Sequence, residues 1–311
     1  MKRFISKLII LFLLLVIINL LYIRTNYWKS ENNVNKFDDV PYNLELGNLG
    51  TSHGLWNFKY DSVPQIKAFN FALLSQTYYY DLQLLKKYYD HFEKNGVVLI
   101  LISYFDITRY PDYSMHRSRY YRILPKSSLD SWSLHEYICF KVFPIFSAKQ
   151  KLLKIFHDIP VEGMSPYYNR TTYLDEKSLY EICVKRHRQW TTPEAEGGRA
   201  GYEMNLSEVS KMIDFCYAHE LTPVLVTTPV TDVFNEIYEK DIDFFPTFEQ
   251  FTKDLLNKYP GLIYLNYSRD EYFSKKHELF FDSDHLNNMG ADEFTITVIQ
   301  DLQEKGVIFF K

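Results

Sequence analysis

Two short segments, far apart in the chain, contain the residues that could do chemistry. Segment 49–53 reads Leu-Gly-Thr-Ser-His and contains Ser52, and segment 282–287 reads Asp-Ser-Asp-His-Leu-Asn and contains Asp282 and His285. A serine hydroxyl becomes a nucleophile when a base takes its proton, and a histidine oriented by a carboxylate is such a base. The two segments together therefore predict serine acyl transfer, with Ser52, Asp282 and His285 as the catalytic residues.

Asp284 is a second candidate for the carboxylate that orients His285. Because it adjoins the histidine, its side chain is expected to point away, and Asp282, three residues before the histidine, is the expected partner. Taken alone, Ser52 is also compatible with an ordinary turn serine followed by a surface histidine, His53. Only the combination of the two segments indicates catalysis.

A metal site in the second segment is the main chemical alternative. Four side chains could bind a metal ion if all of them turned inward: His277, Asp282, Asp284 and His285. Residues 282–293 also have the length of a calcium-binding EF-hand loop, but Asn287 stands where that loop needs glycine. The sequence contains no glycine-rich phosphate-binding loop. We therefore expect neither a metal nor a cofactor.

Alternating apolar strands and amphipathic helices indicate the fold that must position these residues. Continuous apolar runs are typical of strands buried on both faces, and helical spacing of apolar residues separates them. The pattern predicts an α/β fold, a flavodoxin-like three-layer sandwich whose central parallel sheet has about five strands. The expected strands are 44–49, 65–71, 97–102, 223–228 and 262–266, and the expected helices are 76–95, 206–220, 248–258 and 288–305.

The carboxyl ends of the expected strands would bring the chemical residues to one edge. In parallel α/β sheets, functional residues gather at that edge. Ser52 follows the first expected strand, and Asp282 and His285 follow the fifth. The end of the second strand and the residues after it contribute Asn70 and Ser75, and the segment after the third strand contributes Ser103.

Residues 108–203 interrupt this alternation. They are rich in Tyr, Arg and Ser and have only short apolar runs. We interpret them as a large insertion after the third strand, which either contacts substrate or only caps the fold. The expected organisation is an N-terminal anchor over 1–25, a polar linker over 26–40, and a catalytic domain over 41–311 that contains the insertion.

The N-terminal segment predicts a membrane anchor. Residues 4–23 are almost wholly apolar, and a bilayer needs about 20 such residues. Lys2, Arg3 and Lys7 lie on the N-terminal side, which favours a cytoplasmic N-terminus with the remainder outside. The exit from the apolar run lacks the small residues of a signal-peptide cleavage site. We therefore expect a single-pass membrane protein with an extracytoplasmic C-terminal domain.

Composition narrows the possible partners and chemistry. The chain has 311 residues, 46% of them hydrophobic, and a net charge of −4. The main basic run, Lys-Arg-His-Arg at 185–188, is short, so nucleic acid is not an expected partner. The three cysteines, Cys139, Cys183 and Cys216, lie among apolar residues and are expected to be buried thiols.

The two chemical segments resemble blocks of the SGNH/GDSL hydrolase superfamily. Gly-Thr-Ser at 50–52 is similar to the Gly-Asp-Ser turn after the first strand, and Asp-Ser-Asp-His at 282–285 is similar to the closing Asp-x-x-His block. The continuation Leu-Asn-x-x-Gly-Ala looks like members found in polysaccharide O-acetylation and teichoic acid D-alanylation systems. The resemblance implies that Ser52 attacks an acyl carbonyl, that His285 takes its proton and that Asp282 orients the imidazole.

The middle blocks depart from the superfamily pattern. The resemblance implies an oxyanion hole formed by a glycine amide after the second strand and an asparagine side chain after the third. Ser75 stands at the glycine position, and Phe105 stands where the asparagine is expected. Candidate oxyanion donors are therefore the Ser75 amide, Asn70 and Ser103, with a residue of the 108–203 insertion as the alternative to the missing asparagine.

The resulting functional hypothesis is a membrane-anchored, extracytoplasmic serine esterase or O-acyltransferase. Its expected substrate is an ester-linked acyl group, most simply acetyl, on a cell-surface polysaccharide or teichoic acid-like glycan. A membrane-bound O-acyltransferase is a candidate partner. The alternative is a non-catalytic glycan-binding or assembly protein that retains the fold, which the missing asparagine would favour.

Overall fold

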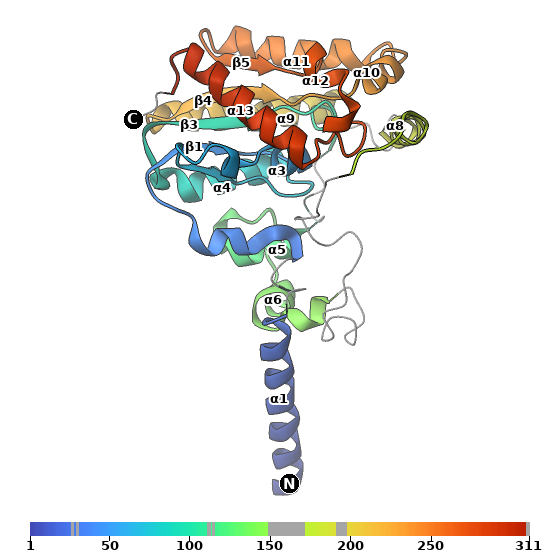
Figure 1. Cartoon of the computed structure of the whole chain (residues 1–311). Helices are drawn as coiled ribbons and strands as arrows, with labels where there is room; N and C mark the ends of the chain where they lie inside the picture. Colours follow the sequence, from blue (N-terminus) through green and yellow to red (C-terminus); the bar gives the residue numbers. More distant parts are fainter. Residues whose placement is uncertain are drawn as a thin grey trace. The chain divides into compact units, whose positions relative to one another are not determined.

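A five-stranded, all-parallel sheet forms the centre of an α/β fold. The structure is a computed structural model and describes residues 1–25, 28, 31–110, 113, 116–148, 172–190 and 198–308. The sheet order β2-β1-β3-β4-β5 is that of flavodoxin-like doubly wound sheets, so the predicted fold class is confirmed (Figure 1). The strands are β1 Leu44–Asn48, β2 Ala68–Asn70, β3 Phe92–Leu101, β4 Thr222–Thr227 and β5 Ile263–Asn266.

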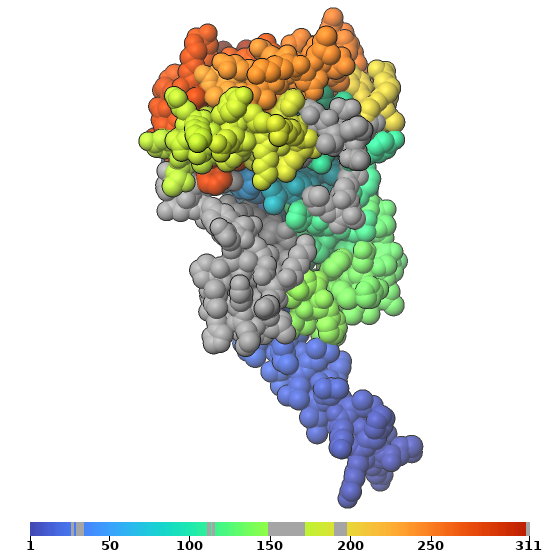
Figure 2. Space-filling view, turned by 90° about the vertical axis from the view of Figure 1, so that its right-hand side faces the viewer, coloured from blue at the N-terminus to red at the C-terminus, as the bar shows by residue number. Residues whose placement is uncertain are grey.

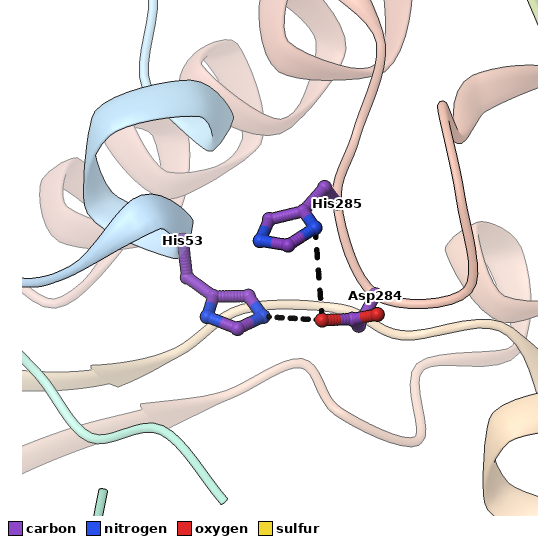
Figure 3. Close-up of side chains that lie close together, drawn as sticks. All are labelled: His53, Asp284 and His285. Atoms are coloured by element: carbon purple, nitrogen blue, oxygen red, sulfur yellow. Dashed lines mark hydrogen bonds and ion pairs between the residues drawn. The ribbon is translucent and has the colours of Figure 1, made fainter. Parts of the chain in front are cut away.

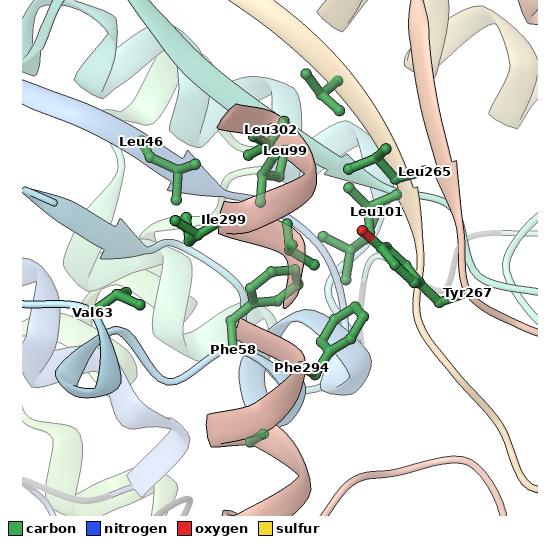
Figure 4. Close-up of a cluster of buried hydrophobic side chains, with 14 of the residues drawn as sticks. Leu46, Phe58, Val63, Leu99, Leu101, Leu265, Tyr267, Phe294, Ile299 and Leu302 are labelled. Carbon is green, nitrogen blue, oxygen red and sulfur yellow. The ribbon is translucent and has the colours of Figure 1, made fainter. Parts of the chain in front are cut away.

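The central strands are apolar on both faces because helices cover both faces of the sheet. Successive side chains of a strand point to opposite faces. Leu99 packs in the core cluster under helix α13 (Asn288–Glu304), whereas Val98 lines a small internal gap with Leu85 of helix α4 (Tyr78–Tyr88). Figure 4 labels side chains of the core cluster under α13: Leu46, Phe58, Val63, Leu99, Leu101, Leu265, Tyr267, Phe294, Ile299 and Leu302.

Further helices connect the strands. The crossover from β3 to β4 ends in the long helix α9 (Gly198–Ala218), which contacts both α4 and β4. The remaining elements of this part of the chain are α3 Ser52–Asn57, η2 Tyr60–Ser62, η3 Tyr89–His91, α8 Glu176–Trp190, α10 Asp232–Tyr238, α11 Phe244–Lys258, α12 Glu271–Ser274 and η7 His277–Leu279.

The expected helix over 76–95 is too long. The α-helix ends at Tyr88, and the strand begins at Phe92, where it pairs with Leu44 across a bulge in the β1–β3 register. Phe92 lies within the expected helix 76–95, but in the structure it belongs to β3 and its ring packs against Phe71, with the centroids 5.8 Å apart. Phe92 therefore packs against apolar neighbours as a residue of the strand, although its spacing in the sequence fits a helix.

The chain divides into two compact units, and the larger one contains the sheet. This unit comprises Pro41–Asp112 and Asn169–Lys311, and the smaller one comprises Met1–Val40 and the described part of Tyr113–Tyr168. The residues expected to form a single insertion over 108–203 are therefore shared between the units. Helix α8 belongs to the larger unit, and Figure 2 shows it in yellow-green on the surface.

The smaller unit begins with the apolar helix α1 (Lys2–Tyr22). It has 21 residues and contains an 18-residue stretch with a mean hydropathy of 2.8, so by length and composition it could cross a membrane. Almost all of its apolar side chains are exposed, and its buried residues are Asn19 and Tyr22. Asn19 donates a hydrogen bond to the Val142 carbonyl at 3.1 Å, which ties the end of the helix to the rest of this unit.

Short helices make up the rest of the smaller unit. Arg117 forms ion pairs with Asp130 at 2.7 Å and Glu136 at 3.2 Å, and Glu136 also accepts a hydrogen bond from the Tyr121 hydroxyl. The expected polar linker contains a 3-10 helix in which Val34 is buried. The elements are η1 Glu31–Asp39, α5 Arg117–Ile123, η4 Lys126–Ser128, α6 Leu134–Tyr137, the π-helix η5 Ile138–Val142 and η6 Pro144–Ser147.

All three cysteines are free thiols. Cys183 and Cys216 are fully buried as expected, and burial raises the pKa of Cys183 to about 12, which leaves it an unreactive thiol. Cys139 differs from the expectation, because it is only half-buried.

Candidate active site

A tight turn after β1 sets the position of Ser52. Gly50 has a φ of 125°, and a Cβ added there would come within 2.9 Å of Leu101, so only glycine fits. The Gly50 amide donates a hydrogen bond at 2.8 Å to the buried Asp81 carboxylate, which fixes the turn. Helix α3 begins at Ser52, immediately after Thr51 in extended conformation.

The segment that carries Asp282 and His285 is closed on itself and tied to α3. The Phe281 amide donates to the His285 carbonyl at 2.8 Å, and the His285 amide donates to Asp282 Oδ1 at 2.9 Å. The next amide, that of Leu286, donates to Oδ1 of the buried Asn57 at 3.0 Å. Asn57 is the last residue of α3, so this bond ties the end of the serine helix to the loop of the histidine.

Ser52, His285 and Asp282 lie in hydrogen-bonding contact. His285 Nε2 is 2.9 Å from Ser52 Oγ, and His285 Nδ1 is 3.0 Å from Asp282 Oδ1. Because an ionised carboxylate only accepts, the imidazole proton lies on Nδ1, and Nε2 is free to accept the proton of the serine hydroxyl. Asp284 is farther from Nδ1, at 3.6 Å, so Asp282 is the orienting carboxylate.

Arg186 of helix α8 binds both aspartates. Its Nη2 is 2.9 Å from Asp282 Oδ2, and its Nη1 donates to Asp284 Oδ1. Burial by itself would raise the pKa of Asp282 and Asp284, but His285 and Arg186 hold the pKa of both carboxyls below their usual range. Burial also lowers the pKa of His285, against the opposing effect of the two aspartates. At neutral pH the site therefore holds two carboxylates, a guanidinium and a neutral imidazole.

His53 and Trp56, both from α3, hold the His285 ring. The two imidazole rings are nearly parallel, with centroids 4.5 Å apart and an interplanar angle of 19°. Trp56 meets the His285 ring edge-on, at 4.7 Å and 76°. His53 is buried, contrary to the surface position considered from the sequence, and its Nε2 is 3.2 Å from Asp284 Oδ2 (Figure 3).

Three neighbouring side chains here are of types that can bind a metal ion, but they are arranged as hydrogen-bonding partners. The nearest ligand atoms of His53, Asp284 and His285 lie within 4.8 Å of one another. The two imidazoles are stacked, so their nitrogen lone pairs run side by side and do not converge on one point, and the Arg186 guanidinium already neutralises Asp284. His277, the fourth ligand considered from the sequence, pairs with Asp232 at 2.6 Å.

The predicted oxyanion donors do not converge on Ser52. The Asn70 amide group donates to the carbonyls of Gly54, Leu55 and Phe58 at 2.9–3.3 Å, so its hydrogens hold α3 and are not available to an oxyanion. The Ser103 hydroxyl accepts from the Phe105 amide and donates its own hydrogen to the Asp106 carboxyl. Neither side chain therefore has a hydrogen left for an oxyanion.

Ser75 remains a candidate through its backbone. It is exposed and has a φ of 51°, the left-handed region in which glycine is usual, which agrees with its alignment to a glycine position. In the part of the chain described, no hydrogen bond joins Ser75 to Ser52. The other suitable donors are the main-chain amides at the start of α3, where the Thr51 side chain makes no capping hydrogen bond.

A cavity of about 550 Å³ lies beside the loop that follows β3. Asn205 of α9 holds this loop by donating to the carbonyls of Asp106, Ile107 and Arg109 at 2.6–3.2 Å. Phe105 lines the cavity and also stacks on His53, with centroids 6.1 Å apart. Rings and charged groups share the wall, which includes Tyr104, Phe105, Arg109, Arg199, Tyr202, Asp241, Asp243 and Phe244.

Sequence reasoning missed the roles of His53 and Arg186. Arg186 belongs to the basic run at 185–188, which was considered only as a nucleic-acid signal. Two buried aspartates in one short segment require a cation, and that requirement was the available signal for an arginine partner. For His53, the only sequence signal was its position next to the serine.

Comparison with known proteins gives no family assignment. No family model matches the chain, and no curated protein matches it. Among solved structures, the crystal structure of a "putative acylhydrolase" from Bacteroides fragilis is similar, with 10% sequence identity and a TM-score of 0.42, over 88% of this chain and 95% of that chain. A likeness of this size carries no argument about the site, so the resemblance to the SGNH/GDSL superfamily stays a prediction and the function must be argued from geometry.

Proposed function

We propose that this chain is a membrane-anchored serine acyl-transfer enzyme that acts on ester-linked acyl groups, most simply acetyl, of a cell-surface glycan. The observation that carries the proposal is the continuous hydrogen-bonded array from Ser52 Oγ through His285 to Asp282, with distances of 2.9 and 3.0 Å. Nucleophile, base and orienting group are each within the reach that acyl transfer needs.

In the first half of the reaction, Ser52 Oγ attacks the ester carbonyl carbon while His285 Nε2 takes the hydroxyl proton. The carbonyl electrons move to the oxygen, and main-chain amides at the start of α3 are the proposed donors to this oxyanion. When the carbonyl re-forms, the bond to the leaving alkoxide breaks and His285 returns the proton to it. An acyl-serine remains.

In the second half, a hydroxyl group attacks the acyl-serine and His285 takes its proton. Attack by water gives a carboxylic acid, and attack by a sugar hydroxyl gives a new ester; in both cases the proton returns to Ser52 Oγ. A membrane-anchored domain lies close to both surface glycan and membrane-bound acyl donors, which supports transfer, with a membrane-bound O-acyltransferase as the candidate partner. The aromatic and charged wall of the 550 Å³ cavity has the chemistry to bind a sugar.

A second candidate, a non-catalytic glycan-binding or assembly protein, is favoured by one observation. Asn70 and Ser103 are both used within the fold, so no side-chain oxyanion donor of the expected kind remains among the described residues. Loss of one such donor slows an enzyme by roughly 10²–10³-fold.

Turnover of an acetyl ester separates the two candidates. We expect the full-length protein to release acetate from 4-nitrophenyl acetate and Ser52→Ala to release none above background. Added oligosaccharide acceptors should divert acetyl groups to sugar in the transferase case and leave acetate release unchanged in the esterase case. Equal activity of the native protein and Ser52→Ala would contradict the enzyme proposal.

A further inference from the structure

A second histidine–aspartate pair lies against the catalytic array, and we propose that His53 and Asp284 position the His285 imidazole and balance its charge. His53 Nε2 is 3.2 Å from Asp284 Oδ2, and both residues are buried. The inference rests on the proposed function, because it gives the pair a role in the same reaction. The acyl transfer written above requires neither residue.

The first step of the argument is packing. His285 is held on one ring face by His53 and on an edge by Trp56, and both contacts come from the short helix that begins with Ser52. A ring fixed in this way keeps its Nε2 lone pair directed at Ser52 Oγ. Small displacements of a catalytic group can cost roughly 10²-fold in rate, so such a support has a measurable consequence.

The second step is the hydrogen bonding of the two His53 ring nitrogens. The Asp284 carboxylate accepts hydrogen bonds only, so the proton of the neutral His53 ring lies on Nε2. Nδ1 is buried and has no hydrogen-bond partner among the described residues. Because Nδ1 is closed to solvent, neither water nor a sugar hydroxyl reaches it, and His53 does not act as a second base.

The third step is the charge balance. Arg186, Asp282 and Asp284 together carry a net charge of −1 when both imidazoles are neutral. One proton on His285, which arrives when Ser52 attacks, brings the cluster to zero. Without Asp284 the same proton would leave a buried net charge of +1, so Asp284 stabilises the imidazolium although Asp282 alone orients it.

The groups around His53 are consistent with this assignment. Asp284 and His285 face it from the loop before α13, and Asp106 and Phe105 face it from the loop after β3. Arg186 from α8 lies on the far side of Asp284.

NMR titration of the imidazoles tests the charge balance without relying on activity. We would label histidine with ¹³C in the full-length protein in detergent micelles and assign His285 from the signal lost in His285→Gln. In Asp284→Asn the titration midpoint of His285 should move to lower pH, because a charge that favours imidazolium is gone. Asp214→Asn, on the exposed face of α9, is the control and should leave the midpoint unchanged.

Kinetics with 4-nitrophenyl acetate test the positioning. In Asp284→Asn the acid limb of kcat/KM should follow the NMR midpoint to lower pH, and the plateau should fall about tenfold or more. His53→Phe keeps the ring contact and loses the hydrogen bond, whereas His53→Gln keeps a donor and loses the ring. Each should lower kcat with little change in KM. The control is His219→Phe, a histidine that stacks on Phe215 at the opposite edge of the sheet.

The outcomes separate this inference from the proposed function. An unchanged His285 midpoint in Asp284→Asn, or wild-type kcat in both His53 variants, would overturn the inference. If Asp284→Asn does not fold, the two His53 variants decide the question through kcat. If the native protein turns over no ester, the proposed function fails, while the NMR titration still decides whether Asp284 stabilises the imidazolium.

Discussion

Burial sets the protonation states of single residues in this site. It lowers the pKa of His285, which keeps the imidazole neutral and able to take the Ser52 proton at neutral pH. Burial shifts the pKa of a carboxyl in the opposite direction, and it raises the pKa of Asp106 to about 6. The nearby His53 and Arg109 side chains and the hydrogen bonds from Ser103 and Thr51 only partly offset this effect of burial. Asp106 is therefore a charged residue that costs stability at neutral pH.

The pH dependence of stability should reveal this cost. The pKa of Asp106 is higher in the folded protein than its ordinary value of 3.8, so its contribution to stability is fully present below about pH 4 and is lost as pH rises through 6. In Asp106→Asn the side chain cannot ionise, so the fall in stability with rising pH does not occur. We expect the variant to be more stable than the native protein by about 1 kcal/mol at pH 7.5, allowing for partial exposure of the carboxyl, with the gain shrinking towards pH 4.5. Thermal unfolding at the two pH values measures it, and a gain that is equal at both would refute the assignment.

The contacts of a single residue could be predicted from the sequence where the parallel sheet alone determines them. Ser52 follows β1, and Asp282 and His285 lie in the segment between β5 and α13. The carboxyl ends of parallel strands lie at one edge of the sheet, so the proximity of the three residues could be anticipated. His53 and Arg186 could not be, because their roles depend on which way a six-residue helix and a surface helix pack. Asn70 was misjudged for a related reason: the carbonyls of α3 compete for its amide hydrogens.

At the scale of elements, a buried hydrogen bond to a main-chain amide adds to the side-chain contacts that join the two halves of the site. Asn57, at the end of α3, accepts from the Leu286 amide, which joins the helix of Ser52 to the loop of His285. Both residues are fully buried, so water cannot replace the bond. The positions of the strands could be predicted from continuous apolar runs. The Asn57–Leu286 hydrogen bond could not be predicted, because it is made by a polar residue inside the core, for which the sequence has no periodic pattern.

Asn57→Ala should impair both stability and reactivity. The substitution leaves the Leu286 amide buried and unpaired, which costs about 1–3 kcal/mol. It also loosens the spacing between Ser52 and His285, so kcat/KM on an acetyl ester should fall. Asn235→Ala is the control, because it removes a similar bond, to the Ser268 carbonyl, from α10. The prediction fails if both variants lose stability equally and keep equal activity.

At the scale of the whole molecule, the chain combines an α/β unit that contains Ser52, Asp282 and His285 with a unit that begins with an apolar helix. The exposed apolar side chains of α1 would be unfavourable in water, and their length and composition suit a bilayer. Lys2, Arg3 and Lys7 favour retention of the N-terminus in the cytoplasm. The division of the chain into two units could not be read from the sequence, because the segment 113–168 shows no periodicity that links it to the N-terminus.

Protease treatment of intact cells tests the topology. We expect full-length protein to remain in the membrane fraction and a C-terminal tag to be digested while the cells are sealed. A tag inserted after Met1 should stay protected and serves as the internal control. Protection of the C-terminal tag would place the α/β unit in the cytoplasm and would contradict a cell-surface glycan as the substrate.

The most direct test of the central claim is labelling by a fluorophosphonate, which reacts with a serine only when a base activates it. Peptide mapping of the full-length protein should find the phosphonyl group on Ser52, with no labelling in Ser52→Ala and strongly reduced labelling in His285→Ala. Asp282→Asn should retain as much labelling as His285→Ala or more, because Asp282 acts through the imidazole. Labelling at another serine, or equal absence of labelling in the native protein and Ser52→Ala, would contradict an activated Ser52 and favour the assembly protein.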